Sequence, residues 1–86
     1  MNQPTVGRIV HFVIDEHTAK QFNDCKDGNS VQAGEVLPAV IVRTWGGTCV
    51  NLRVLRDAGT DGWVTSVAQE DETCATRCWR WPLLTK

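Results

Sequence analysis

The sequence lacks any apolar run that approaches the roughly 20 residues needed to cross a bilayer. Its opening MNQPTVGRIV has no basic patch leading into an apolar segment, as a secretion signal would have. It also lacks a basic excess, because nine Lys and Arg stand against ten Asp and Glu. A protein that holds long nucleic acid by its phosphates is expected to be basic. We therefore expect a cytoplasmic protein that binds neither a membrane nor long nucleic acid.

The cysteines lack the spacing of a metal site. Cys25, Cys49, Cys74 and Cys78 contain no C-x-x-C pair, and the two histidines do not complete a recognisable ligand set. Cys74 and Cys78 could meet on a helical turn but would lie about 13 Å apart on a strand. We expect free thiols, with no bound metal and no cofactor.

Tryptophan is abundant for a chain of this size. Residues 1–86 predict a single small domain, which buries only about 60% of its unfolded surface, so four tryptophans are a large share of its core. Trp79 and Trp81 flank Arg80 near the C-terminus. On a strand the two indoles point to one side and Arg80 to the other. We expect at least one indole to plug the core, with a stacking surface as the alternative.

Five segments have the composition of β-strands, and turn-forming residues bound them. They are VGRIVHFVI (6–14), EVLPAVIVRTW (35–45), TCVNLRVL (48–55), WVTSV (63–67) and CWRWPL (78–83). The polar segment 15–35 predicts one long early loop with a short helix, capped by Asp15 and carrying Ala19 and Phe22 on one side. The fold class is therefore mainly all-β, a small five-stranded antiparallel SH3-like barrel. An OB-fold is disfavoured, because only seven residues separate the third and fourth strands where it usually has a helix.

Alternation assigns the side chains of the third strand to two faces. Val50, Leu52 and Val54 are expected to face inward, and Asn51 and Arg53 outward.

In the second strand, Val40 and Val42 are expected to join the inward set, which leaves Arg43 and Trp45 together on the opposite face. A guanidinium offers paired donors to phosphate, and an indole offers a broad face to a base. The alternative is that Trp45 closes one end of the barrel, and that Arg43 packs its stem across a tryptophan or pairs with a loop carboxylate.

The first two strands are apolar on both faces, whereas a single small sheet needs only one apolar face to pack on its core. The segment 15–35, another copy of the protein, or both are expected to cover the second face, and on this ground we expect a homo-oligomer. The residues concerned are Val10, Phe12 and Ile14 on one face, Ile9 and Val13 on the other, and Leu37, Ala39 and Ile41 in the second strand.

Catalytic patterns are missing. The sequence has no Ser-His-Asp order, no paired inward carboxylates and no glycine-rich phosphate loop, because WGGT is only a hairpin turn. His11 lies mid-strand among hydrophobic residues, where a structural role is favoured over ligand binding or proton transfer. Thr65 and Ser66 place one hydroxyl on each face, suited to a phosphate or ribose but also to ordinary strand pairing. We predict that the protein is not an enzyme.

Four short motifs are present: G-R-I-V-H at 7–11, V-N-L-x-V at 50–54, T-S-V at 65–67 and W-x-W-P at 79–82. Together they resemble a group of small proteins common in phage and prophage genomes. The resemblance covers most of the chain except the early loop. It implies an accessory phage protein in the cytoplasm of an infected or lysogenic bacterial host. Arg80 stands where the pattern has His, which argues against proton transfer there.

Two functions of different classes follow. The first is an anti-defence sponge, a homo-oligomeric protein that sequesters a small nucleotide immune signal without cleaving it. The alternative is a protein-interaction module, either a virion accessory protein or an inhibitor that docks on a host protein. The candidate ligand-binding residues are Arg8, His11, Arg43, Trp45, Asn51, Arg53, Trp63, Thr65 and Ser66.

Overall fold

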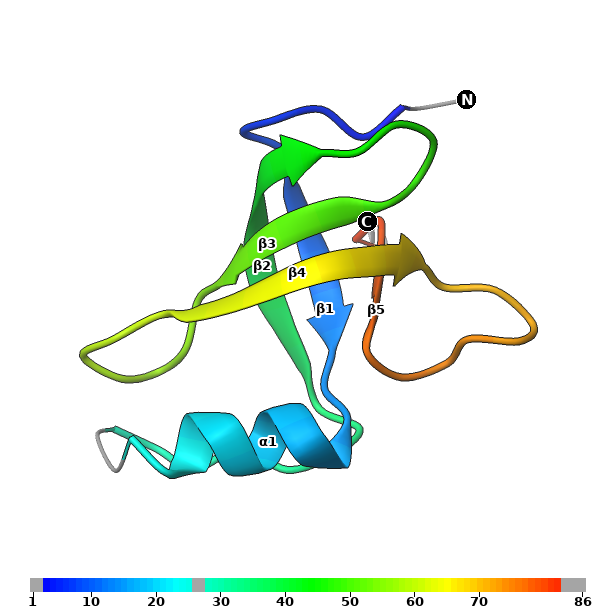
Figure 1. The fold of residues 1–86 in the computed structure, drawn as a ribbon. Coiled ribbons are helices and arrows are strands. Elements are labelled where there is room, and N and C mark those ends of the chain that lie inside the picture. The colour runs from blue at the N-terminus through cyan, green and yellow to red at the C-terminus, as the bar shows by residue number, and fades with distance from the viewer. Residues whose placement is uncertain (1–2, 26–27, 83–86) are drawn as a thin grey trace, which may run out of the picture.

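The computed structural model describes residues 3–25 and 28–82 as a closed five-stranded β-barrel with a single short helix, consistent with the SH3-like fold expected (Figure 1). The strands and the helix match the predicted segments to within a few residues, except that the last strand is shorter. Leu83, predicted to end that strand, lies outside the described residues. The elements are β1 (Ile9–Val13), α1 (Glu16–Asn23), β2 (Val36–Thr44), β3 (Val50–Val54), β4 (Gly62–Gln69) and β5 (Cys78–Arg80).

The strands follow one another around the barrel in chain order. Each of β1–β2, β2–β3, β3–β4 and β1–β5 is antiparallel, whereas β4 and β5 run parallel. A ring of five strands cannot alternate direction throughout, because an odd number leaves one neighbouring pair pointing the same way. The loop between β4 and β5 therefore projects away from the barrel and turns back before β5 begins (Figure 1).

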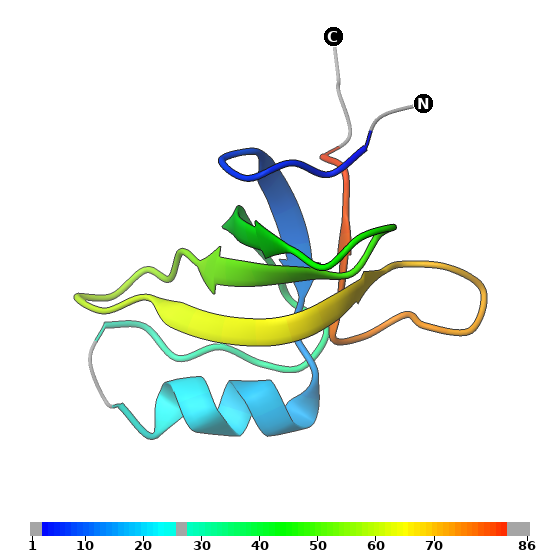
Figure 2. The same cartoon turned by 45° about the horizontal axis from the view of Figure 1, so that its top comes forward.

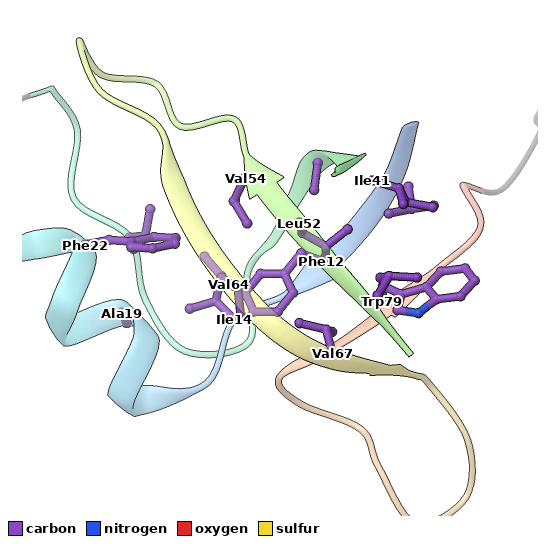
Figure 3. Close-up of a cluster of buried hydrophobic side chains, with 14 residues drawn as sticks. Phe12, Ile14, Ala19, Phe22, Ile41, Leu52, Val54, Val64, Val67 and Trp79 are labelled. Carbon is purple, nitrogen blue, oxygen red and sulfur yellow. The ribbon is translucent and has the colours of Figure 1, made fainter. Parts of the chain in front are cut away.

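The core runs through the barrel from α1 to the last strand. Val50, Leu52 and Val54 are fully buried, as the alternation of β3 predicted. Phe22 lies at one end of the cluster and Trp79 at the other (Figure 3). The indole expected to plug the core is therefore Trp79.

The predicted faces of β2 are wrong. Ala39 and Ile41 are completely buried, whereas Val42 is 42% exposed and Val40 is only half-buried. Directly paired residues of neighbouring strands share a face, and Ile41 pairs with Leu52. Because β2 is apolar at consecutive positions, its composition does not distinguish the inward phase from the outward one.

Two β-bulges interrupt the ladder. One lies in β2 between Ile41 and Arg43, and the other lies where β4 passes β3 between Val50 and Leu52. A bulge places an extra residue in one strand and shifts the alternation beyond it. Arg43 therefore faces solvent although Ile41, two residues earlier, is buried.

Helix α1 covers the barrel beside β4 (Figure 2). It buries Ala19 and Phe22, the two residues predicted for its inner side. Asp15 occupies the N-cap position with extended backbone, but its side chain makes no capping hydrogen bond. Asn23 at the end of the helix donates from Nδ2 to the carbonyl of Val31 and accepts from its N–H, both at 2.8 Å. These two bonds hold the following loop against the helix.

Candidate ligand-binding site

A pocket of about 230 Å³ opens between α1 and β4. Its lining comes from three separate parts of the chain, so it forms only when the helix and the loop before β5 are in place. The lining residues are His17, Thr18, Gln21, Trp63, Val64, Thr65 and Arg77.

Trp63 and Arg77 bring an aromatic face and a cation to this pocket. Trp63 is 60% exposed, so its indole is accessible to a ligand. Arg77 donates from Nη2 to the carbonyl of Thr65 at 3.1 Å, and its N–H donates to the carbonyl of Val13 at 2.8 Å. A guanidinium has five N–H donors, so this one bond leaves others for an anion. The described lining contains no Asp or Glu that would repel such an anion.

Asn51 on β3 holds the second bulge together. Its Oδ1 accepts three hydrogen bonds, from Trp45 Nε1 at 2.8 Å, Thr65 Oγ1 at 2.9 Å and Ser66 N at 2.8 Å. Ser66 has a φ of 56°, a conformation that costs energy for a residue with a side chain. The bulge removes its N–H from the regular ladder, and the Asn51 carbonyl replaces the lost acceptor.

The bulge also changes the predicted directions of two hydroxyls. Thr65 and Ser66 were expected on opposite faces, but their oxygens lie 3.4 Å apart. Both residues occupy the extra length of β4 opposite Asn51, so neither hydroxyl points into the core, where Val64 and Val67 are buried. Thr65 instead connects the Asn51 side chain to the pocket that it helps to line.

Arg43 and Trp45 form a stacked pair on the outer face. The guanidinium carbon of Arg43 lies 4.2 Å from the centroid of the Trp45 ring. Trp45 is 52% exposed, so it does not close one end of the barrel. Arg43 is also paired with Asn51 across β2 and β3. This arrangement places a cation and an indole beside the Asn51 amide.

A second outward pair lies further along the same strands, where Arg53 of β3 is opposite Trp63 of β4. Both side chains are exposed. The structure therefore gathers seven of the nine predicted site residues on the outward side of β2, β3, β4 and the turn after β2, with Asn51 buried beneath its neighbours. They are Arg43, Trp45, Asn51, Arg53, Trp63, Thr65 and Ser66.

Arg8 and His11 are placed elsewhere. The guanidinium carbon of Arg8 lies 4.8 Å from the ring centroid of Trp81, which itself meets Trp79 edge-on at 5.2 Å. His11 in β1 lies between Pro38 of β2 and Arg80 of β5. Both residues therefore belong to the β1–β5 side of the barrel, separate from the pocket.

Sequence reasoning missed the part of the lining that α1 and the last loop contribute. His17, Thr18 and Gln21 lie on a helix that was predicted, but nothing in the sequence indicates which strand the helix covers. Arg77 has a φ of 51°. A positive φ at arginine leaves no composition signal, because such turns usually contain glycine or asparagine.

Two ionisable groups near β5 have shifted pKa values. Hydrogen bonds from the hydroxyl and N–H of Thr73, both 2.8 Å, lower the pKa of the Asp71 carboxyl. Burial raises the pKa of the Cys78 thiol to about 11, with a smaller contribution from Cys74. The four cysteines are free thiols. Asp71 and Cys78 are not among the residues that line the pocket.

Within residues 3–25 and 28–82, no three His, Cys, Asp or Glu side chains gather to form a metal site. No helix in the same ranges is long and apolar enough to span a membrane. Compared with known proteins, the chain matched no protein-family model, no curated protein and no solved structure. The resemblance to small phage proteins therefore stays a prediction from the four motifs.

Proposed function

We propose that the protein binds a small nucleotide noncovalently in the pocket between α1 and β4. The observation that carries this proposal is the accessible Trp63 indole beside the Arg77 guanidinium in one pocket. An indole stacks on any base, and a guanidinium pairs with phosphate oxygens. The pocket is smaller than the roughly 300–1,000 Å³ of sites that enclose a drug-sized ligand. It accommodates one part of a nucleotide, and the rest lies over the outer surface of the sheet.

The pocket is held in shape before any ligand arrives. Arg77 is fixed by hydrogen bonds to Thr65 and Val13, and Thr65 is fixed by Asn51. Stacking contributes roughly 1–3 kcal/mol per base, and a hydrogen bond to a charged group roughly 1.5–3 kcal/mol. Association costs several kcal/mol or more, so tight binding needs a site that is already ordered. These fixed side chains supply that order.

In this proposal the protein is a phage-encoded sponge. It lowers the free concentration of a nucleotide immune signal in the host cytoplasm and releases it unchanged on denaturation. The four sequence motifs support the phage origin, and the net charge of −1 suits a small ligand better than a long polymer.

Calorimetry tests the proposal. Cyclic dinucleotides, cyclic trinucleotides and ADP-ribose derivatives are titrated into the wild type, Trp63→Ala and Arg77→Gln. We expect at least one ligand to bind, and each variant to weaken its binding at least about tenfold. Arg8→Gln removes the same charge from the other side of the barrel and is the matched control. No binding across the panel would contradict the proposal, and recovery of a cleaved nucleotide would indicate an enzyme.

A protein-interaction module stays the second candidate function, because several apolar side chains are exposed in and around β1 and β2. Val6, Ile9 and Val42 are all exposed, and Ile9 pairs with Val40 on the outer face of β1 and β2. Exposed apolar patches are typical of interfaces. We propose that this face mediates a homo-oligomer.

Light scattering at tens of micromolar tests the oligomer separately from ligand binding. We expect a dimer or larger species for the wild type and a monomer for Ile9→Lys, because a charge at this position opposes burial. Lys20→Glu on the exposed surface of α1 is a control. A wild-type monomer would remove the support for this interface, and a docking partner other than a second copy would then be sought.

A further inference from the structure

We infer that the ligand belongs to the dinucleotide class, with two ring systems joined through phosphate. This inference rests on the proposed function and deepens it. Its basis is a second subsite next to the pocket, formed by Arg43, Trp45 and Asn51, which we term the Asn51 subsite.

The amide group of Asn51 is an unpaired donor in this subsite. Trp45 Nε1 and Ser66 N can only donate, so the oxygen of the Asn51 side chain must face them. The nitrogen Nδ2 is thereby assigned, and it makes no hydrogen bond within the described part of the chain. Asn51 is only 6% exposed. Asn51 Nδ2 is not among the buried side-chain atoms that lack a partner, so this donor is in contact with solvent and can bond to an acceptor on a ligand.

The neighbours of this amide define the ligand chemistry. Arg43 is opposite Asn51 in the β2–β3 register and supplies a guanidinium. The Trp45 indole is anchored at Nε1, has the Arg43 guanidinium over its ring and is still 52% exposed. An amide donor and a cation suit a phosphate oxygen or a base carbonyl, and the indole suits a flat ring. The Asn51 subsite therefore repeats the chemistry of the Trp63–Arg77 pocket.

Thr65 joins the two places. Its hydroxyl donates to Asn51 Oδ1, its carbonyl accepts from Arg77, and its side chain lines the pocket. Asn51 lies opposite the bulge that contains Thr65 and Ser66, and Trp63 precedes Thr65 by two residues in β4.

Arg53 lies next to Trp63 on the outer face, two residues after Asn51. It is the next outward residue after Asn51 on β3 and is opposite Trp63. A linking phosphate over Arg53 would allow one ring to stack on Trp45 and the other on Trp63. A mononucleotide carries one base and leaves one of these indoles uncovered.

Comparing ligands of different size tests the inference. AMP, GMP, a linear dinucleoside monophosphate, a cyclic dinucleotide and NAD, whose two halves are joined by pyrophosphate, are titrated by calorimetry. The weak ligands are followed by NMR at millimolar concentration. We expect at least one dinucleotide to bind about tenfold or more tightly than either mononucleotide. Mononucleotides that bind equally well would overturn the inference and leave the proposed function standing. No binding by any ligand would overturn both.

Variants of the Asn51 subsite supply the second test. Asn51→Asp keeps an oxygen for the three donors but replaces the amide donor with a negative charge. We expect Asn51→Asp and Trp45→Ala to weaken dinucleotide binding about tenfold, and to change mononucleotide binding less than about threefold. Trp63→Ala should weaken both, and Arg8→Gln neither. The inference fails if the two subsite variants bind the dinucleotide as the wild type does.

The indole N–H resonances separate a binding effect from a folding effect. The protein has four tryptophans, so four such signals are expected. In Asn51→Asp the Trp45 signal should keep the downfield position of a hydrogen-bonded N–H. If that signal moves to the position of a free indole, Asn51→Leu and Trp45→Phe are compared to establish whether ring placement alone explains the lost affinity. If the dinucleotide affinity of Asn51→Asp, Asn51→Leu and Trp45→Phe depends only on whether the ring at position 45 keeps its place, the Asn51 amide does not contact the ligand directly.

Discussion

The indole Nε1 of Trp79 donates a hydrogen bond of 2.8 Å to the carbonyl oxygen of Thr48, 31 residues earlier in the chain. Trp79 is fully buried, and its polar atom is nevertheless paired. The bond joins β5 to the turn between β2 and β3, two segments that do not share a ladder. The Trp79 side chain thus fills the end of the core and fixes β5 relative to the β2–β3 hairpin.

Truncation of Trp79 should therefore be costly. Trp79→Ala leaves a cavity and an unpaired carbonyl, and we expect a loss of about 3–5 kcal/mol in the free energy of unfolding, measured with urea. Trp81→Ala should cost less, because Trp81 is only partly buried and packs on Trp79 edge-on. Equal losses for the two variants would mean that Trp79 does not have the central role assigned here.

The three bonds to Asn51 make this residue important for stability as well as for the ligand. Asn51→Leu leaves Trp45 Nε1, Thr65 Oγ1 and Ser66 N without their acceptor. We expect a loss of about 2–4 kcal/mol. Asn51→Asp retains an acceptor and should lose less than half as much. The interpretation of Asn51 as the acceptor that holds the bulge is wrong if both variants unfold at the same urea concentration.

Close packing of Phe22 explains why β4 begins with glycine. A Cβ added to Gly62 would overlap the Phe22 ring, and the φ of Gly62 is not positive. Gly62→Ala should therefore destabilise the protein by about 1–3 kcal/mol through overpacking. The double variant Gly62→Ala, Phe22→Leu should recover part of the loss relative to Phe22→Leu alone. Strictly additive effects in this double-mutant cycle would argue against a steric clash.

Stability at alkaline pH should depend on Cys78. Burial raises the pKa of its thiol from 9.0 to about 11. In the folded protein the thiol keeps its proton to higher pH than in the unfolded chain, so the free energy of unfolding should fall as pH rises from about 9 to about 11. We expect this loss of unfolding free energy to be about 2 kcal/mol larger in the wild type than in Cys78→Ala, measured by urea unfolding at each pH. Parallel pH profiles for the two proteins would rule out this contribution.

Much of the barrel could be predicted because neighbouring residues specify it. The strict alternation of Val50, Leu52 and Val54 identifies the inner face of β3, and all three are buried. The glycines at 46 and 47 both have positive φ, which suits the turn between β2 and β3. Ala19 and Phe22 lie three residues apart and face the core together, as a helical period requires.

The inward face of the second strand could not be predicted in this way. Its apolar residues at consecutive positions allow either phase, and only pairing with β1 and β3 selects Ala39 and Ile41 for the interior. Arg43 was expected on the outer face and lies there, but it does so because a bulge after Ile41 restores the outward direction. A bulge is a property of two paired strands, and the sequence of one strand does not contain it.

Composition and local periodicity by themselves determined five strands, a short helix and the inner face of β3. Tertiary structure alone decided that Trp79 fills the core while Trp45 and Trp63 remain accessible, and that Arg8 stacks on Trp81, away from the pocket. It also brought His17 and Arg77, 60 residues apart in numbering, to the same pocket. The physical reason is that secondary structure depends on near neighbours, whereas a binding site depends on which distant segments close the barrel together.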